Sequence, residues 1–146
     1  MIDGAAVWYA APFPSAISSG MSRNPSGPPY ERLEAWKACH ELALLIYRAS
    51  HTWPASERFG ITAQARRAAY SAAANLVEGS ARSGSRELAR FVTIALGSLA
   101  ELEYLVLLAR DVGAIDAEEW RLLTGHIARA GQLTGGLHRA LRARRP

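Results

Sequence analysis

The chain has 146 residues, of which 49% are hydrophobic and 21% charged, a balance that fits a single soluble globular domain and excludes a wholly disordered protein. Seventeen Lys and Arg residues against thirteen Asp and Glu give a net charge of +4, and every cation except Lys37 is an arginine. With Cys39 as the single cysteine, the sequence excludes an internal disulfide and a zinc site built from cysteines, which favours a reducing compartment, the cytoplasm.

Residues 1–29 differ in composition from the rest of the chain. They are rich in proline, glycine and serine, and such a segment neither sustains a helix nor buries enough surface to fold. We therefore expect a disordered leader over residues 1–29 and a folded domain over residues 30–146. Trp8, Tyr9 and Phe13 leave open the alternative that the leader packs on the domain.

Membrane association is not expected from the sequence. The amino terminus lacks the basic region of a secretory signal. The longest uninterrupted apolar stretches fall far short of the roughly 20 residues that a spanning helix needs.

From Tyr30 onward the apolar residues recur at steps of three and four, the period of a helix. A first helix is predicted up to Pro54, which closes it, and residues 54–60 form a connector. A second helix is predicted from about residue 61 to 77, with a face of small residues: Ala65, Ala68, Ala72 and Leu76.

The second half of the chain predicts two further helices. The third runs from Ser85 to about Val112, where Gly113 is placed to end it in the left-handed conformation. Asp116 and Glu119 have the spacing of a capping box that opens the fourth helix. Four helices with short connectors and no strand predict an all-α, antiparallel, up-down-up-down four-helix bundle.

Residues 79–84 have the glycine spacing of a phosphate-binding loop. The lysine of such a loop is replaced by Ser85, and a helix precedes the loop instead of a strand, so nucleotide hydrolysis is not expected. Ser83 or Ser85 is placed to cap the third helix, whose free amides favour an anion. Three arginines flank this helix start: Arg82, Arg86 and Arg90. They define either a phosphate-binding corner or a set of solvated arginines paired with neighbouring acids.

A polar stripe accompanies the alanine face of the second helix at steps of three or four residues: Gln64, Arg67, Ser71, Asn75 and Glu78. Glu101 of the third helix is placed to meet Arg67 or Asn75, near Gly97, whose missing side chain permits close approach. Buried polar groups are tolerated only when they are paired. We therefore predict a structural polar network that fixes the helix register, and not an acid–base site.

Metal and cofactor sites are not predicted. The four histidines are scattered, and no pair has the i, i+4 spacing of a helical metal site. Cys39 has no acid–base partner nearby in the sequence and is interpreted as a small buried residue. No residue pattern marks an enzyme.

The carboxyl-terminal region is the clearest charge feature. After Glu119 the chain contains no acid, whereas six arginines follow: Arg121, Arg129, Arg139, Arg142, Arg144 and Arg145. A basic helix end suits binding to a phosphate backbone, and the alternative is a set of arginines that complement the helix dipole. The candidate nucleic-acid-binding residues are Arg66, Arg82, Arg86, Arg90, Arg139, Arg142, Arg144 and Arg145.

Residues 30 to about 142 resemble a known family on a combined set of motifs. The residues that carry the resemblance are Trp36, Ala38, Leu42 and Ile46-Tyr47 in the first helix, then Trp53-Pro54, Glu57 to Ile61, Gln64, Arg66 to Ala69, Ser71 and Asn75 to Gly79, and finally Phe91, Ala95 to Ser98 and Glu101 to Glu103. In these residues the chain is similar to the four-helix-bundle proteins encoded in intervening sequences of bacterial 23S ribosomal RNA genes. It is similar, more distantly, to the accessory proteins of diversity-generating retroelements. Trp53 stands where the family usually has phenylalanine, and Leu96 where a basic residue is common.

The resemblance implies an antiparallel four-helix bundle that assembles as a cyclic homopentamer with a basic surface in contact with RNA, and it implies no enzymatic activity. Two functions follow as hypotheses. The first is a non-enzymatic protein that binds RNA or DNA with little sequence specificity. The second is a protein-interaction scaffold, for example an accessory subunit of a reverse transcriptase.

Overall fold

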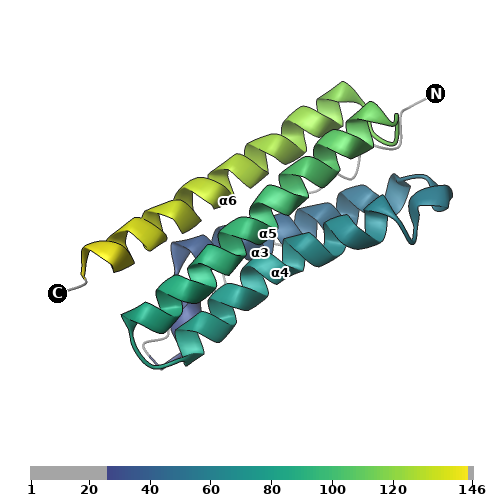
Figure 1. The fold of residues 1–146 in the computed structure, drawn as a ribbon. Coiled ribbons are helices and arrows are strands. Elements are labelled where there is room, and N and C mark those ends of the chain that lie inside the picture. The colour runs from purple at the N-terminus through teal and green to yellow at the C-terminus, as the bar shows by residue number, and fades with distance from the viewer. Residues whose placement is uncertain (1–25, 145–146) are drawn as a thin grey trace.

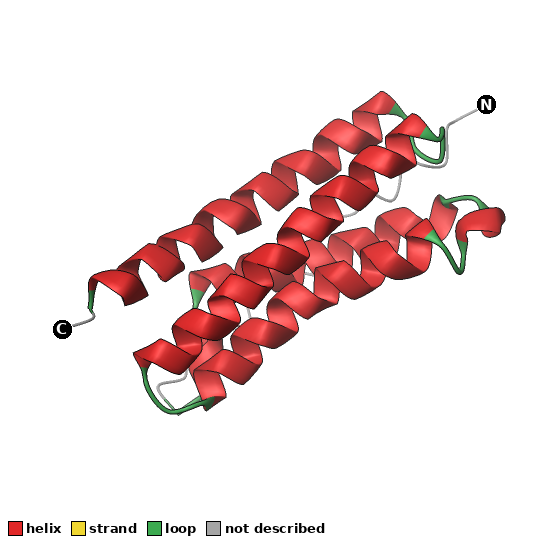
Figure 2. Cartoon of the chain, viewed as in Figure 1, coloured by secondary structure: helices red, strands yellow, loops and turns green. Residues whose placement is uncertain are grey.

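The computed structural model describes residues 26–144 and folds them into four α-helices (Figure 1). The helices are α3 (Glu34–Ala49), α4 (Ile61–Ala81), α5 (Ser85–Asp111) and α6 (Ala117–Ala143), with the 3-10 turns η1 (Pro29–Arg32), η2 (Ser50–Thr52) and η3 (Ala55–Glu57). The described part of the chain contains no strand (Figure 2). The predicted all-α class with four helices is confirmed, whereas most of the predicted leader lies outside the described residues.

Each helix packs against two others, and the four together enclose one core. α4 and α6 each lie between α3 and α5, so the chain closes on itself around the core (Figure 1). The largest fully buried side chains come from all four helices: Leu42, Ile46, Leu76, Val92, Leu102, Val106 and Leu123. Burying one such side chain stabilises the fold by about 1.5–3 kcal/mol, so this layer supplies much of the driving force.

Helix α4 extends further than the sequence predicted. Gly79, expected in the break, lies inside α4 and is buried, and the connection to α5 covers only residues 82–84. Helix α5 begins after Gly84, which has a φ of 92° and provides no side-chain cap. The prediction that Ser83 or Ser85 caps this helix is therefore wrong.

The junction between α5 and α6 follows the sequence prediction. Gly113, which follows the C-cap residue Val112 of α5, adopts a φ of 78°, which a residue with a side chain rarely tolerates. The Asp116 side chain accepts a hydrogen bond of 2.8 Å from the Glu119 amide and caps α6. These two residues fix where α6 starts relative to α5.

Helix α5 is the one described helix that is long and apolar enough to cross a membrane by length and composition alone. Glu101 and Glu103 are its only charged residues between Phe91 and Leu108. No such segment was expected from the sequence, because its uninterrupted apolar stretches are short and the two glutamates interrupt this one. One face of α5 is buried against α4 and α6, and core helices of soluble proteins meet the same criterion.

Candidate nucleic-acid interface

The start of α5 and the end of α6 meet at one end of the bundle. The hydroxyl of Thr93, two turns into α5, lies 3.3 Å from Nε2 of His138 near the end of α6. Six of the predicted nucleic-acid-binding arginines lie at this end, which we call the basic end, and all six are exposed: Arg82, Arg86, Arg90, Arg139, Arg142 and Arg144. The fold therefore brings together two arginine groups that are about 50 residues apart in the sequence (Figure 1, lower left).

A close contact between α4 and α5 positions part of the basic end. A Cβ on Gly79 would lie 2.6 Å from Cβ of Phe91, so only glycine allows this approach. Phe91 is buried, and its ring lies under the guanidinium groups of Arg82 at 5.7 Å and Arg90 at 5.3 Å. These cation–π contacts hold two arginines above a fixed ring.

Most arginines of the basic end form no salt bridge with the described residues. Arg82 donates a hydrogen bond of 2.8 Å to Glu78, and both side chains are about half exposed, so the pair contributes little to stability. Among the described residues, the other five arginines of the basic end form no salt bridge. Their charge is available to an external anion. The last predicted member of the group, Arg145, lies outside the described residues.

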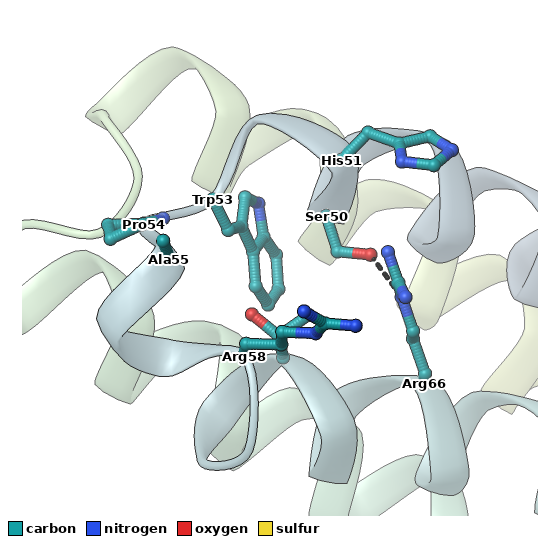
Figure 3. Close-up of a pocket in the computed structure, with 8 residues that line it drawn as sticks. Ser50, His51, Trp53, Pro54, Ala55, Arg58 and Arg66 are labelled. Carbon is teal, nitrogen blue, oxygen red and sulfur yellow. Dashed lines mark hydrogen bonds between the residues drawn. The ribbon is translucent and has the colours of Figure 1, made fainter.

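Arg66 lies away from the basic end. It is in the second turn of α4, about 24 Å along the helix from Arg82 at 1.5 Å per residue. Its Nε donates a hydrogen bond of 2.7 Å to Ser50 Oγ (Figure 3). Its guanidinium lies 5.0 Å from the Tyr47 ring. Arg66 therefore belongs to a different surface from the other candidates.

The predicted polar network is present only as a smaller cluster. Ser71 Oγ lies 3.0 Å from Ser98 Oγ, and the Asn75 amide donates hydrogen bonds to the carbonyl and hydroxyl oxygens of Ser71 at 2.8 and 3.2 Å. Glu78 pairs with Arg82 instead. The remaining three predicted members are exposed and form no side-chain hydrogen bond among the described residues: Gln64, Arg67 and Glu101.

The predicted close approach at Gly97 is also wrong. Nothing lies within 4 Å of a Cβ built on Gly97, which is exposed on the outer face of α5. The glycine that permits close packing of α4 and α5 is Gly79. The sequence pattern placed Gly79 in the loop after the second helix, so its contact with Phe91 was not predicted, and only the packing decides which glycine faces a neighbour.

His40 and Cys39 take part in packing. His40 stacks on Trp36 with ring centroids 5.1 Å apart, and no cluster of potential metal ligands occurs in the part of the chain that the structure describes. Cys39 is fully buried, and desolvation raises the pKa of its thiol, against a smaller opposing effect of its 3.6 Å contact with the Thr134 hydroxyl.

The geometry thus defines an all-α protein with four helices and an arginine-rich end. In a comparison with protein families, the model described as 23S rRNA-intervening sequence protein matches residues 31–136. The chain belongs to this family. A comparison with curated proteins gives no significant match.

Proposed function

We propose that the protein binds the phosphate backbone of RNA or DNA through the basic end, without catalysis, with little sequence specificity, and in the cytoplasm. The observation that carries this proposal is the convergence of six exposed arginines from the α4–α5 connection, α5 and α6, five of them without an ion pair among the described residues. Arginine forks match phosphate oxygens, and contacts to the backbone supply affinity but no sequence information.

We further propose that the helices form an antiparallel bundle. Contacts between neighbouring helices support this arrangement, because they pair the start of one helix with the end of the next. Ser71 in the middle of α4 contacts Ser98 in the middle of α5, while Gly79 near the end of α4 contacts Leu88 near the start of α5. The short connection over residues 82–84 also suits an antiparallel pair.

Assembly into a homopentamer is the next part of the proposal, and it is supported by exposed apolar side chains on α4 and α5. Four large hydrophobic side chains of α4 and α5 are exposed: Tyr70, Ile94, Tyr104 and Leu107. A groove of about 190 Å³ lined by α5 and α6 residues, among them Leu99 and Ile127, provides a neighbouring recess. Exposed apolar surface of this kind marks interfaces. A ring would repeat the basic end and gain avidity for a long nucleic acid.

The test is a salt titration of binding to structured RNA and to duplex DNA, with two matched variants. Arg142→Glu/Arg144→Glu reverses two charges at the basic end, and Arg121→Glu/Arg129→Glu reverses two exposed charges elsewhere on the same helix. We expect the first variant to bind at least about 30-fold more weakly, and the salt slope to fall by about two, because two phosphate contacts are lost. The second variant has the same net charge and should bind nearly as well as wild type.

Equal losses in the two variants would mean that only net charge matters and would contradict a defined basic interface. Absence of binding to either nucleic acid at low salt would contradict the proposal as a whole.

A second candidate function, a protein-interaction scaffold for a partner such as a reverse transcriptase, is favoured by the same exposed apolar side chains of α4 and α5. Self-assembly through this surface and binding of a different protein through it predict different masses of the purified protein in solution. Light scattering should give a multiple of the 15.8 kDa chain if the apolar surface is covered by further copies of the protein. A monomer mass at micromolar concentration would contradict the ring and shift the weight to a different protein partner.

A further inference from the structure

A cavity of about 280 Å³ lies at the end of the bundle opposite the basic end, where the connection over residues 50–60 folds back on the start of α4. We call this the pocket end. The cavity walls include two arginines, Arg58 and Arg66, together with Ser50, His51, Trp53 and Thr62. Figure 3 shows both arginine side chains reaching toward the space between the connection and α4.

The charges around the cavity are not balanced from within the protein. Arg58 and Arg66 form no salt bridge among the described residues, and no acid lines the cavity. Two acids of this region accept hydrogen bonds from neutral groups and form no salt bridge with either arginine: Glu57 Oε2 accepts one of 3.2 Å from the Ile61 amide, and Glu119 Oε1 accepts one of 2.9 Å from Trp53 Nε1. Two cations that face one cavity repel each other unless an anion lies between them.

An unsatisfied hydroxyl lies in the same wall. Thr62 is 5% exposed, lines the cavity, and its Oγ1 has no hydrogen-bond partner among the described residues. Buried hydroxyls are almost always paired, so an unpaired one needs an explanation, and a bound water or ligand is one such explanation. The hydroxyl oxygen is buried in its present rotamer, and a change to the second χ1 rotamer that threonine adopts on helices would turn it toward a ligand oxygen.

These donors suit a phosphate better than a carboxylate. A phosphate monoester carries up to two negative charges and three terminal acceptor oxygens, so it balances two guanidinium groups and accepts from a hydroxyl more fully than a singly charged carboxylate does. The cavity is also larger than a bare phosphate requires and approaches the lower end of small-ligand pockets, roughly 300 Å³. The buried indole of Trp53 gives it an apolar wall for part of the carrier molecule.

We propose that this cavity binds the phosphate monoester of a small molecule of nucleotide size, held by Arg58, Arg66 and Thr62. The site is separate from the basic end, and the proposal does not depend on nucleic-acid binding there.

The experiment is calorimetric titration of the full chain with adenosine monophosphate, with adenosine as the matched probe that lacks the phosphate. We expect the monophosphate to bind, inorganic phosphate to compete with it, and adenosine not to bind. Arg58→Gln should weaken binding by about 10-fold or more, because a charge-assisted contact is lost. The control Arg129→Gln removes an exposed arginine on α6, outside the cavity, and should leave binding unchanged.

Thr62→Val gives a second, independent readout. It replaces the unpaired hydroxyl by a methyl group of nearly the same shape, so it should weaken monophosphate binding and raise the melting temperature of the ligand-free protein. A variant that merely disturbed the fold would lower both the affinity for the monophosphate and the melting temperature.

The source of the phosphate is distinguished by an RNA oligonucleotide with a 5′-phosphate and the same oligonucleotide with a 5′-hydroxyl. Stronger binding of the phosphorylated strand that is lost in Arg58→Gln would identify a strand terminus as a ligand, and equal binding of both would identify the free small molecule. Absence of monophosphate and phosphate binding at millimolar concentration, or equal weakening by Arg58→Gln and Arg129→Gln, would overturn the proposal.

Discussion

The two ends of the bundle use the same side chain in different surroundings. At the basic end, arginines stand on exposed helix turns around the short connection of residues 82–84. At the pocket end, the longer connection of residues 50–60 covers the start of α4, and Arg58 and Arg66 face a cavity. Arginines spread over exposed helix turns suit a long, flexible polyanion, whereas two arginines that line one cavity suit one small anion. The length and course of the connection, more than the charge, determine which kind of ligand each end fits.

The largest effect is expected from removing the wall of the pocket end. Trp53 is 6% exposed and donates a hydrogen bond to Glu119, which links the α3–α4 connection to the first turn of α6. Trp53→Ala should lower the free energy of unfolding by about 3–5 kcal/mol, the cost of a large cavity. Phe59→Ala is the matched control in the same connection, because Phe59 is 88% exposed, and it should have almost no effect. Urea denaturation of both variants measures the difference.

Trp53→Phe separates packing from hydrogen bonding at this position. It retains a ring but loses the donor to Glu119, and a loss of about 1 kcal/mol is expected. If Trp53→Ala cost no more than Phe59→Ala, the connection would not be a fixed wall, and the distinction between the two ends would fail.

The sequence predicted the features that depend on neighbouring residues. The four helices follow from the three- and four-residue spacing, and Gly113 and Asp116 mark the junction of α5 and α6 through local turn and capping chemistry. The grouping of the arginines of α5 with those of α6 was only partly predictable. Each group was visible in the sequence, but their convergence depends on how the helices pack.

The pocket end was missed because its residues are divided between a connector and a helix. Arg58 and Thr62 were not singled out, and Arg66 was assigned to the nucleic-acid surface. A four-residue spacing of Arg58, Thr62 and Arg66 was present in the sequence and is the spacing that places side chains on one side of a helix. These three residues line a cavity only because residues 50–53 fold back and cover that side of the helix, and no local sequence pattern indicates this fold.

A smaller effect is expected where α4 and α5 support the basic end. Gly79→Ala would place a methyl group 2.6 Å from Cβ of Phe91, and such overpacking costs about 1–3 kcal/mol, partly offset by the helix preference of alanine, about 1 kcal/mol. Gly97→Ala meets nothing within 4 Å and should stabilise the protein by about 0.5–1 kcal/mol. Thermal unfolding of the two variants should therefore shift in opposite directions.

If Gly79→Ala and Gly97→Ala both raised the melting temperature, Phe91 would have moved aside without a cost in stability. The ring would then not hold Arg82 and Arg90 in place, and the basic end would be a set of independent side chains.

The smallest effect concerns pH and tests how tightly the core is packed between α3 and α6. Burial raises the pKa of the Cys39 thiol above its ordinary value of 9.0, so above pH 9.0 the unfolded chain loses a proton that the folded chain retains. The thiol's contribution to stability is therefore complete below pH 9.0 and is lost as the pH rises toward the folded-state pKa, by at most about 1.4 kcal/mol per pH unit. Cys39→Ala removes this contribution, so the difference in unfolding free energy between wild type and variant should shrink above pH 9.0. A constant difference would mean that water reaches the thiol beside Thr134, and the layer between α3 and α6 would then be as open as the cavity at the pocket end.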